Sequence, residues 1–563
     1  MGGFRRSGPP LPFPGIVGAI GRPHCMTGTI FTGGPILSMD AADTRPEAVG
    51  ICGDRILAVG GLSNVRQALP EASIHDLHGR TLIPAFIDPH GHFPDSAIVS
   101  LLRADLSPGA GSRCLSDVLA RLAAKAGETA PGDWVMGAGF DETQLTERRM
   151  PTRDELDAVS NIHPIWVLHT SGHCGVANSM AMARQGIDGS SADPDGGRYL
   201  RDASGRLTGG IEGLSAMGAM GDTHFLIDDA SFAKCFAAAR DEYLAQGVTL
   251  AQNSWTALPL LELFQKVALK GDPGIDLILL PVAEIEPGLS RDGFGRDWPD
   301  GAIRLGPRKL LTDGSFQMRT AFLTAPYLGT QVHGLPYLDR DTLFAETRKL
   351  HRLGFQIHCH CNGDAASDMF LDAVAAAQDE RPRPDHRHTI IHGQVMRRDQ
   401  IRRCADLGVT ISFFPAHVWY WGDQHHETIL GPDRAQDISP TAWASAEGLR
   451  FTIHNDASVT PTRPLKLIDT TVNRRTRGGR ILGPDQRISP LAALRAHTID
   501  AAWQVFREDE RGSLEPGKLA DLAILEDNPL ARPDTIGAIE ICETWRHGRQ
   551  VYRRHAAPAD GRA

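Results

Sequence analysis

The chain has 563 residues, of which 41% are hydrophobic and 22% are charged, and its formal net charge is −10 at pH 7. An acidic chain without a stripe of basic residues is repelled by phosphate backbones, so nucleic acid is not expected as a partner. No apolar run approaches the roughly 20 residues that span a bilayer, so a membrane partner is not expected either.

The cysteines and the N-terminal segment indicate a cytoplasmic protein. Nine scattered cysteines without a CxxC pair suit a reducing compartment and do not predict a disulfide framework. Near the N-terminus two arginines are followed by four prolines before residue 15. A signal peptide is the alternative interpretation, but prolines would interrupt its apolar helical segment. We therefore expect residues 1–26 to form a flexible extension, with Met26 as a second candidate for the natural start.

Short apolar stretches separated by glycine turns mark both ends of the chain. In residues 27–80 the turns fall at Gly33 and Gly53, and the same hairpin pattern returns in residues 512–555 around Gly548. Two terminal sets of short strands that flank a long middle predict one small β-sandwich domain, completed by residues 27–80 together with residues 512–555.

The middle of the chain alternates apolar strands with long helical segments, as parallel α/β folds do. Helices are predicted at residues 232–246 and 366–378. Strands are predicted near residues 82–88, 248–253, 275–282, 308–313, 355–360, 388–392, 409–414 and 450–456. The expected fold is a (β/α)₈ barrel of the TIM type over residues 81–511, with an inserted lobe at about residues 94–230. The alternative, an open doubly wound sheet, would need a glycine-rich phosphate turn after its first strand, and the sequence has none.

The first of these strands ends in two histidines. His90 and His92 are two residues apart, which in a strand places both side chains on one face. At the C-terminal end of a barrel strand this face points into the mouth, where two neutral imidazoles suit zinc or a similar transition metal. Asp88 has the same phase and could support the ligands from behind. Two nearby histidines are also common on surface loops, so this motif alone does not decide the matter.

Three later strands end in the same way. The fifth strand ends at His360, a candidate ligand, with His358 as a satisfied interior histidine one layer deeper. The sixth strand ends at His392, and the eighth ends at Asp456, with His454 deeper in the barrel. Independent core histidines would not be expected to coincide at the same relative position, so these residues together predict a metal site.

Several segments of the chain carry a resemblance to a known family. They are the strand ends described above, with His90 and His92, His360, His392 and the late Asp456, and the segments Lys309–Ser315, Trp419–Asp423 and Gly512–Asp521. Together these segments resemble the metal-dependent amidohydrolase superfamily, and within it the amidohydrolase-3 group of N-substituted formamide deformylase-like proteins. They are spread over most of residues 27–550.

The resemblance implies a centre that binds divalent metal, with one or two ions per chain and zinc as the expected ion. Its implied ligands are His90, His92, His360, His392 and Asp456. Lys309 occupies the place where such enzymes often carry a carboxylated lysine that bridges two metals. An N6-carboxylysine is expected there because a plain ammonium repels a cation. The alternative is an unmodified Lys309 that forms a salt bridge with Asp313 or with a substrate carboxylate.

The implied reaction is hydrolysis of an amide-type C–N bond in a small molecule, either an N-substituted formamide or a related amide. A metal-activated water attacks the carbonyl, and Asp456 acts as general acid and base. The alternatives are a deacetylase, a carbamate hydrolase or a cyclic-amide hydrolase. An alternative from another class is a catalytically silent barrel that acts as a binding scaffold. The oligomeric state is open, with a homo-oligomer as one option.

Two features point to substrate binding. His173 matches the position at which the resembling family places a substrate-facing histidine, although a satisfied loop histidine is an equal alternative. Trp421 and Phe414 belong to an aromatic cluster after the seventh strand, which should overhang the mouth and favour an apolar or aromatic N-substituent. Core packing is the alternative for this cluster. His425 and His426 close by are expected to form a solvated pair.

Overall fold

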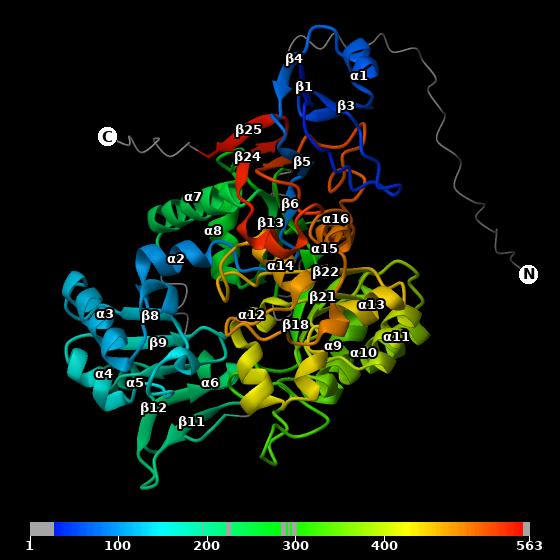
Figure 1. The fold of residues 1–563 in the computed structure, drawn as a ribbon. Helices are drawn as coiled ribbons and strands as arrows, with labels where there is room; N and C mark the ends of the chain where they lie inside the picture. The colour runs from blue at the N-terminus through cyan, green and yellow to red at the C-terminus, as the bar shows by residue number, and fades with distance from the viewer. Residues whose placement is uncertain are drawn as a thin grey trace, which may run out of the picture.

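A barrel of parallel strands lies at the centre of the computed structural model, which describes residues 28–554 except 195, 221–226, 283–288, 291–292 and 295–300 (Figure 1). Its strands follow the order of the chain. They are β6 (Phe86–Ile87), β13 (Val248–Thr256), β14 (Asp276–Pro281), β18 (Arg308–Leu311), β19 (Ile357–Cys361), β20 (Thr389–His392), β21 (Thr410–Phe413) and β22 (Phe451–Ile453). A parallel bridge between Val282 and Lys309 joins the β6–β14 half to the β18–β22 half. The short strand β17 (Ile303–Leu305), just before β18, also pairs with β14. The predicted α/β barrel of the TIM type is confirmed.

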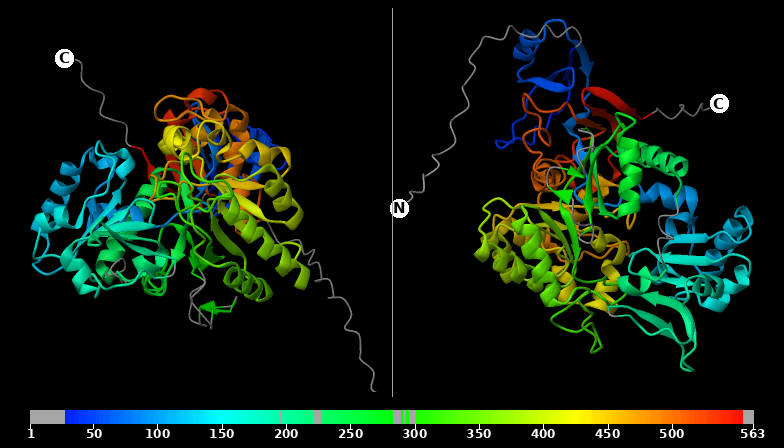
Figure 2. Two further views of the ribbon diagram at one scale, coloured as in Figure 1. Left: turned by 90° about the horizontal axis from the view of Figure 1, so that it is seen from below. Right: turned by 180° about the vertical axis from the view of Figure 1, so that it is seen from behind.

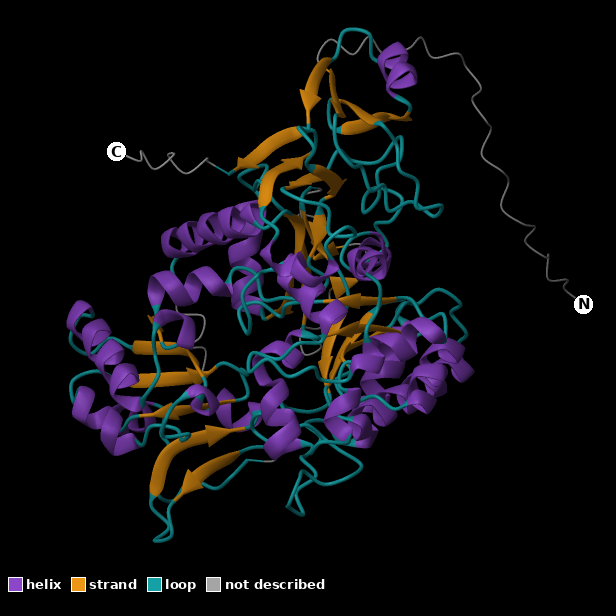
Figure 3. Cartoon of the chain, in the orientation of Figure 1, coloured by secondary structure: helices purple, strands orange, loops and turns teal. Residues whose placement is uncertain are grey.

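Helices surround the barrel, most of them on its outside, and α12 among them lies at the mouth (Figure 3). They are α7 (Asp229–Ala245), α8 (Leu258–Ala268), α9 (Arg340–Arg352), α10 (Asp364–Glu380), α11 (Arg398–Leu407), α12 (Ala416–Gln424), α13 (Thr441–Ala446), α14 (Pro464–Asn473), α15 (Pro490–Ala496) and α16 (Ile499–Gln504). Helix α7 begins where the Asp228 carboxylate accepts the backbone N–H groups of Ala230 and Ser231. It then buries Phe232 and Phe236 in the main hydrophobic core. The two helices predicted from the sequence correspond to α7 and α10.

Strands from both ends of the chain lie together at the top of Figure 1. One sheet has the order β3-β2-β1-β4 and the other β25-β24-β23-β5. Their bounds are β1 (Gly28–Thr32), β2 (Ala48–Cys52), β3 (Arg55–Gly60), β4 (Ser73–Asp76), β5 (Thr81–Pro84), β23 (Leu522–Leu525), β24 (Ile541–Arg546) and β25 (Arg549–Arg553), with α1 (Leu62–Ala68) beside the first sheet. Phe31 and Val49 of the first sheet share a buried cluster with Leu522 and Ile524 of the second. That the two sheets form a separate β-sandwich domain stays a prediction.

A lobe with its own sheet lies beside the barrel and is drawn in cyan and blue-green in Figures 1 and 2. Its sheet has the order β11-β12-β10-β9-β8-β7 and its own hydrophobic cores. The strands are β7 (Ala104–Asp105), β8 (Val135–Phe140), β9 (Ile165–His169), β10 (Cys174–Ala177), β11 (Arg198–Arg201) and β12 (Leu207–Glu212). The helices are α2 (Asp95–Leu102), α3 (Leu115–Glu128), α4 (Arg153–Val159), α5 (Ser179–Arg184) and α6 (Leu214–Gly218). Helix α2 packs against α7, which connects the lobe to the barrel.

The described free cysteines are Cys114, Cys174, Cys235, Cys359, Cys361, Cys404 and Cys542. The expected flexible extension at residues 1–26 lies outside the described residues. Among the helices that the structure does describe, none combines the length and the hydrophobicity needed to cross a bilayer.

Candidate metal centre and substrate cavity

His90, His92 and Asp456 meet at the C-terminal mouth of the barrel. The first two follow β6 and the third follows β22, so neighbouring barrel strands present them to one another. Asp456 Oδ1 lies 3.4 Å from His90 Nε2 and 3.2 Å from His92 Nε2. One ligand atom from each of the three residues lies within 4.8 Å of the other two. This set of two imidazole nitrogens and one carboxylate oxygen matches the donors that zinc takes in proteins.

His392 and His360 continue the same cluster. His392 Nδ1 lies 3.9 Å from Asp456 Oδ2, and His392 Nε2 lies 3.0 Å from His360 Nδ1. His360 Nε2 lies 3.1 Å from the carbonyl oxygen of Gly314 and 3.1 Å from the Asn362 side-chain nitrogen. All five side chains predicted from the strand ends therefore lie in one contiguous group. His360 and His392 would have to exchange their mutual hydrogen bond for contacts with a cation.

Burial sets the protonation of the cluster. It lowers the pKa values of His90, His360 and His392 well below the usual range, so these imidazoles are neutral, the form that binds metal. Burial would raise the pKa of Asp456, but its hydrogen bond and charge interaction with His92 outweigh burial and lower that pKa to about 2. The group thus holds an ionised carboxylate beside three neutral imidazoles. Burial would lower the pKa of His92, but its hydrogen bond and charge interaction with Asp456 outweigh burial and raise that pKa.

Lys309 lies on β18 with a buried and unpaired amine. Its side chain is 2% exposed, and Nζ has no hydrogen-bond partner among the described residues. Burial lowers the pKa of this amine to about 8. A salt bridge to Asp313, one of the alternatives from the sequence, is not formed. The Asp313 carboxylate instead accepts the backbone N–H groups of Phe322, Asn362 and Gly363 at 2.8–2.9 Å.

Two other expectations about histidines are wrong. His358 was expected to be satisfied, but both of its ring nitrogens are buried without a hydrogen-bond partner among the described residues. His425 was expected to be solvated, but it is fully buried and its Nε2 lies 3.0 Å from His417 Nδ1. These outcomes depend on which loops pack over the strand ends, and the local sequence carries no signal for that.

The predicted deeper position of His454 agrees with the structure. Its Nε2 lies 3.1 Å from His392 Nδ1, and its Nδ1 lies 2.9 Å from Ser412 Oγ. Asp88, in contrast, makes no hydrogen bond to a ligand imidazole among the described residues, and burial raises its pKa to about 7. Support of the ligands from behind therefore comes from His454 and not from Asp88.

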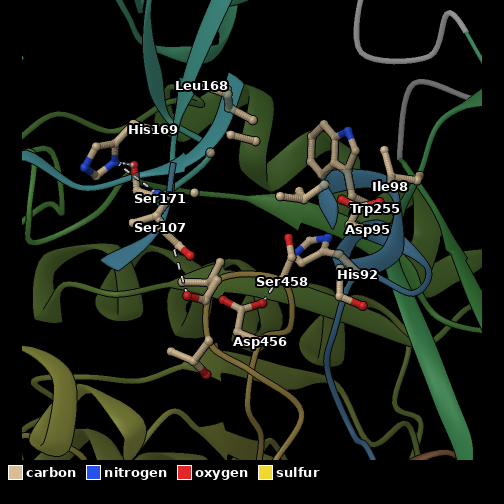
Figure 4. Close-up of a pocket in the computed structure, with 18 of the residues that line it drawn as sticks. His92, Asp95, Ile98, Ser107, Leu168, His169, Ser171, Trp255, Asp456 and Ser458 are labelled. Atoms are coloured by element: carbon tan, nitrogen blue, oxygen red, sulfur yellow. Dashed lines mark hydrogen bonds and ion pairs between the residues drawn. The ribbon is translucent and has the colours of Figure 1, made fainter. Parts of the chain in front are cut away.

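A cavity of about 870 Å³ opens over this cluster, between the barrel mouth and the lobe (Figure 4). This volume lies in the range of sites for drug-sized ligands. Its lining includes the six residues that the sequence indicated as metal ligands, which are His90, His92, Lys309, His360, His392 and Asp456. In Figure 4 His92 and Asp456 lie on the barrel side, with Leu168 and Ser171 of the lobe across from them.

Both residues predicted to contact the substrate line this cavity. His173 is buried, and its Nδ1 lies 3.2 Å from Tyr337 Oη. Its ring centre is 5.3 Å from that of His360, and burial lowers its pKa to about 4. Trp421, on α12, is 3% exposed and donates a hydrogen bond to Asp141 of the lobe. The aromatic cluster therefore serves both as core and as cavity wall.

Sequence reasoning missed most of the apolar lining. Ile98 of α2, Trp255 of β13 and Leu168 of the lobe contribute to the cavity. Trp255 could have been found, because it lies at the C-terminal end of a predicted barrel strand. The lobe residues carried no such signal, since their place over the mouth depends on how the lobe packs.

Comparisons with known proteins agree with this arrangement. Residues 73–552 match the model of a family described as the amidohydrolase family. The chain is 27% identical over 536 residues to N-substituted formamide deformylase of Arthrobacter pascens, covering 92% of this chain and 97% of that protein. It is 26% identical over 552 residues to putative amidohydrolase YtcJ of Bacillus subtilis, covering 93% and 99%. A solved structure of an uncharacterised metal-dependent hydrolase from Pyrococcus horikoshii is similar in fold, with a TM-score of 0.72 at 24% identity over 90% of this chain and 99% of that one.

Proposed function

The chain belongs to the amidohydrolase family, metal-dependent enzymes that hydrolyse carbon–nitrogen bonds other than peptide bonds, and we propose that its substrate is an N-substituted formamide or a closely related small amide. The observation that carries this proposal is that Asp456 Oδ1 lies 3.4 Å from His90 Nε2 and 3.2 Å from His92 Nε2, in the lining of a cavity large enough for such a molecule. The name of the Arthrobacter relative supports the choice of a formamide.

We propose that zinc is the resident ion and that Lys309 is carboxylated. His90, His92, His360, His392 and Asp456 are the proposed protein ligands. A divalent cation held there would polarise the substrate carbonyl and lower the pKa of a water. An amine that is buried, unpaired and low in pKa favours the neutral form that reacts with carbon dioxide, and the resulting carbamate could bridge a second ion. One or two ions per chain are therefore proposed.

The chain's own groups would carry the proton and hold the substrate. Asp456 is ionised at neutral pH, so its carboxylate can take a proton from the attacking water and deliver it to the leaving nitrogen. The products would be a carboxylate and an amine. His173, a neutral imidazole in the cavity wall, is proposed to hydrogen-bond the substrate, and Trp421 is proposed to pack against an apolar N-substituent.

We also propose a division of the chain into domains. Residues 27–80 with residues 512–555 would form a composite β-sandwich domain, and residues 81–511 the barrel with its inserted lobe at about 94–230. The shared cluster of the two terminal sheets supports the first assignment, and the separate hydrophobic cores of the lobe support the second. A cytoplasmic enzyme that acts on small molecules, without nucleic acid or membrane partners, fits the acidic composition.

A chelation and rescue experiment on a panel of amides tests the proposal. The purified chain would be depleted of metal, reloaded with zinc or manganese, and assayed on N-substituted formamides, N-acetyl amino acids, carbamates and hydantoin-like rings. We expect turnover of the formamides that disappears with chelation and returns with metal. Preference for another class of amide would instead support the alternative assignment as a deacetylase, carbamate hydrolase or cyclic-amide hydrolase. Protein that binds no metal under these conditions would favour the binding scaffold.

A further inference from the structure

Trp421 and Asp141 meet on the cavity wall although they are 280 positions apart in the chain. Trp421 lies on α12, which follows barrel strand β21, whereas Asp141 follows β8 of the lobe sheet. The indole N–H of Trp421 donates a hydrogen bond of 3.0 Å to Asp141 Oδ2. Both residues are nearly inaccessible, at 3% and 4% exposed. This is a charge-assisted hydrogen bond shielded from water, a strong kind of protein hydrogen bond.

The Asp141 carboxylate is itself held in place. Its Oδ1 accepts the backbone N–H of Thr143 at 3.0 Å and also the Thr143 hydroxyl. The carboxylate therefore cannot turn away from Trp421 without giving up its other bonds. Two further hydrogen bonds join the lobe and the barrel nearby, from Gln424 to the Thr143 carbonyl and from Arg477 to Gln144, but both are 3.3 Å long and more exposed. The Asp141 contact is the shorter and more buried of these links.

The contact decides which surface the indole offers to the cavity. Asp141 occupies the only polar atom of the ring, so the surface that remains is apolar. The ring also packs against aromatic neighbours, with the His417 ring centre at 4.7 Å and that of Phe414 at 6.4 Å. Phe414 in turn stacks on His454 at 5.0 Å. The orientation of Trp421 is thus fixed by two kinds of contact, packing against barrel residues and a hydrogen bond to one carboxylate of the lobe.

We propose that Asp141 is a positioning residue that sets substrate specificity, because it holds Trp421 as a flat apolar wall for a bulky N-substituent. The inference rests on the proposed function, and it adds that the lobe selects the substrate while the barrel carries the chemistry. Loss of the carboxylate leaves a buried indole N–H unpaired, so the ring reorients toward water in the cavity. Bulky substrates then lose a contact that small substrates never made.

The test compares N-phenethylformamide with N-methylformamide on Asp141→Ala, Asp141→Asn, Trp421→Phe and the Asp141→Ala/Trp421→Phe double variant. In Asp141→Ala we expect KM for the bulky substrate to rise about tenfold, with kcat within about threefold. KM for the small substrate should stay within about twofold, and the metal content should not change. Asp141→Asn keeps one acceptor oxygen and should be intermediate. The double variant should be no worse than Trp421→Phe alone, because both changes remove the same contact.

Asp188→Ala is the matched control. Asp188 also lies in the lobe and accepts the N–H and the hydroxyl of a residue two positions on, Ser190, but it is exposed and lies outside the cavity lining. It should change neither KM. Equal effects of Asp141→Ala on both substrates, or additive losses in the double variant, would overturn the proposal.

A readout independent of turnover separates this proposal from the proposed function. If the unaltered protein hydrolyses neither formamide, the proposed function fails, and binding of N-phenethylformamide followed by tryptophan fluorescence decides the role of Asp141. A Kd that rises about tenfold in Asp141→Ala, but not in Asp188→Ala, supports it. An unchanged Kd, or no binding to any variant, contradicts it.

Discussion

His392 and Asp456 both turn through the left-handed region of backbone space, with φ of 76° and 53°. Such a conformation costs a residue other than glycine about 1–3 kcal/mol and is retained where the surroundings over-determine it. His392 ends β20 and Asp456 lies three residues after β22, and both belong to the candidate metal centre. Residues outside the candidate centre, such as the exposed His78, share this conformation, so it supports the proposed site only together with the side-chain cluster.

Substitution of Asp456 should separate metal binding from proton transfer. Asp456→Asn keeps an oxygen for the cation but removes the group that accepts the proton, so kcat should fall by about 10²–10⁴-fold. Metal content, measured by elemental analysis, should stay near that of the unaltered protein. Turnover close to normal in this variant would remove Asp456 from the acid–base role.

Lys309 gives a second prediction at this scale, because its modification and the number of ions are linked. If Lys309 is carboxylated, the unaltered chain should hold two ions rather than one and should show a carbamate carbon by NMR after incubation with ¹³C-bicarbonate. Lys309→Met should hold one ion, since an uncharged methionine cannot bridge. One ion per unaltered chain, together with an unmodified Lys309, would contradict the bridged centre and leave a single-ion site.

At the scale of elements, the barrel strands were predictable because strands buried on both faces read as apolar runs. β14 illustrates this, since every residue of Asp276–Pro281 is buried. The clustering of the proposed ligands was predictable for a related reason, because a polar residue after the C-terminal end of such a run lies at the mouth of a barrel. The environments of His358 and His425 were not predictable, because segments far away in the chain determine what surrounds each ring.

Buried histidines just before β20 should make the stability of the fold depend on pH. His386 Nε2 donates to the carbonyl of Leu407 at 2.8 Å, and the N–H of His388 donates to His386 Nδ1 at 2.9 Å, so His386 is held neutral. Burial lowers the pKa of His386 to about 4, against about 6.5 when unfolded.

Between pH 6.5 and 4 the unfolded chain therefore binds a proton that the folded chain does not. The free energy of unfolding should fall as the pH falls through this window, by about 3 kcal/mol at most from this residue. His386→Gln should show a shallower loss, measured by urea unfolding from pH 7 to pH 4. His78→Gln, at an exposed histidine, is the control. Identical slopes for His386→Gln and the unaltered chain would contradict the prediction.

At the scale of the whole molecule, a buried ionic cluster connects the barrel to the terminal sheets. Asp276 begins β14, and its carboxylate contacts Arg546 of β24 at 2.6 Å and also Arg511. All three residues are 5% exposed or less. Burial opposes the ionised form, but the Arg511 charge, His547 and Arg546 outweigh it and hold the pKa of Asp276 far below its usual range.

Removal of this carboxylate should loosen the whole molecule. Asp276→Asn leaves two buried guanidinium groups without their main partner, which costs about 3–5 kcal/mol and should lower Tm by several degrees. Asp272→Ala is the matched control, because Asp272 pairs with the same Arg546 at 2.9 Å from a side chain that is 62% exposed, where a pair contributes about 1 kcal/mol or less. Equal shifts of Tm in the two variants would show that the buried cluster is not the connection.

The sheet of the lobe comes from one uninterrupted stretch of chain, from β7 to β12, inserted between two barrel strands. A segment that leaves and re-enters its host at a single place can be lengthened, shortened or replaced in one genetic event without altering the order of the barrel strands. Recombination that replaces the lobe could therefore change the substrate specificity of such a protein and leave the residues of the barrel mouth unaltered. A replacement lobe would need only a hydrogen-bond acceptor at the position of Asp141 to bind the indole N–H of Trp421.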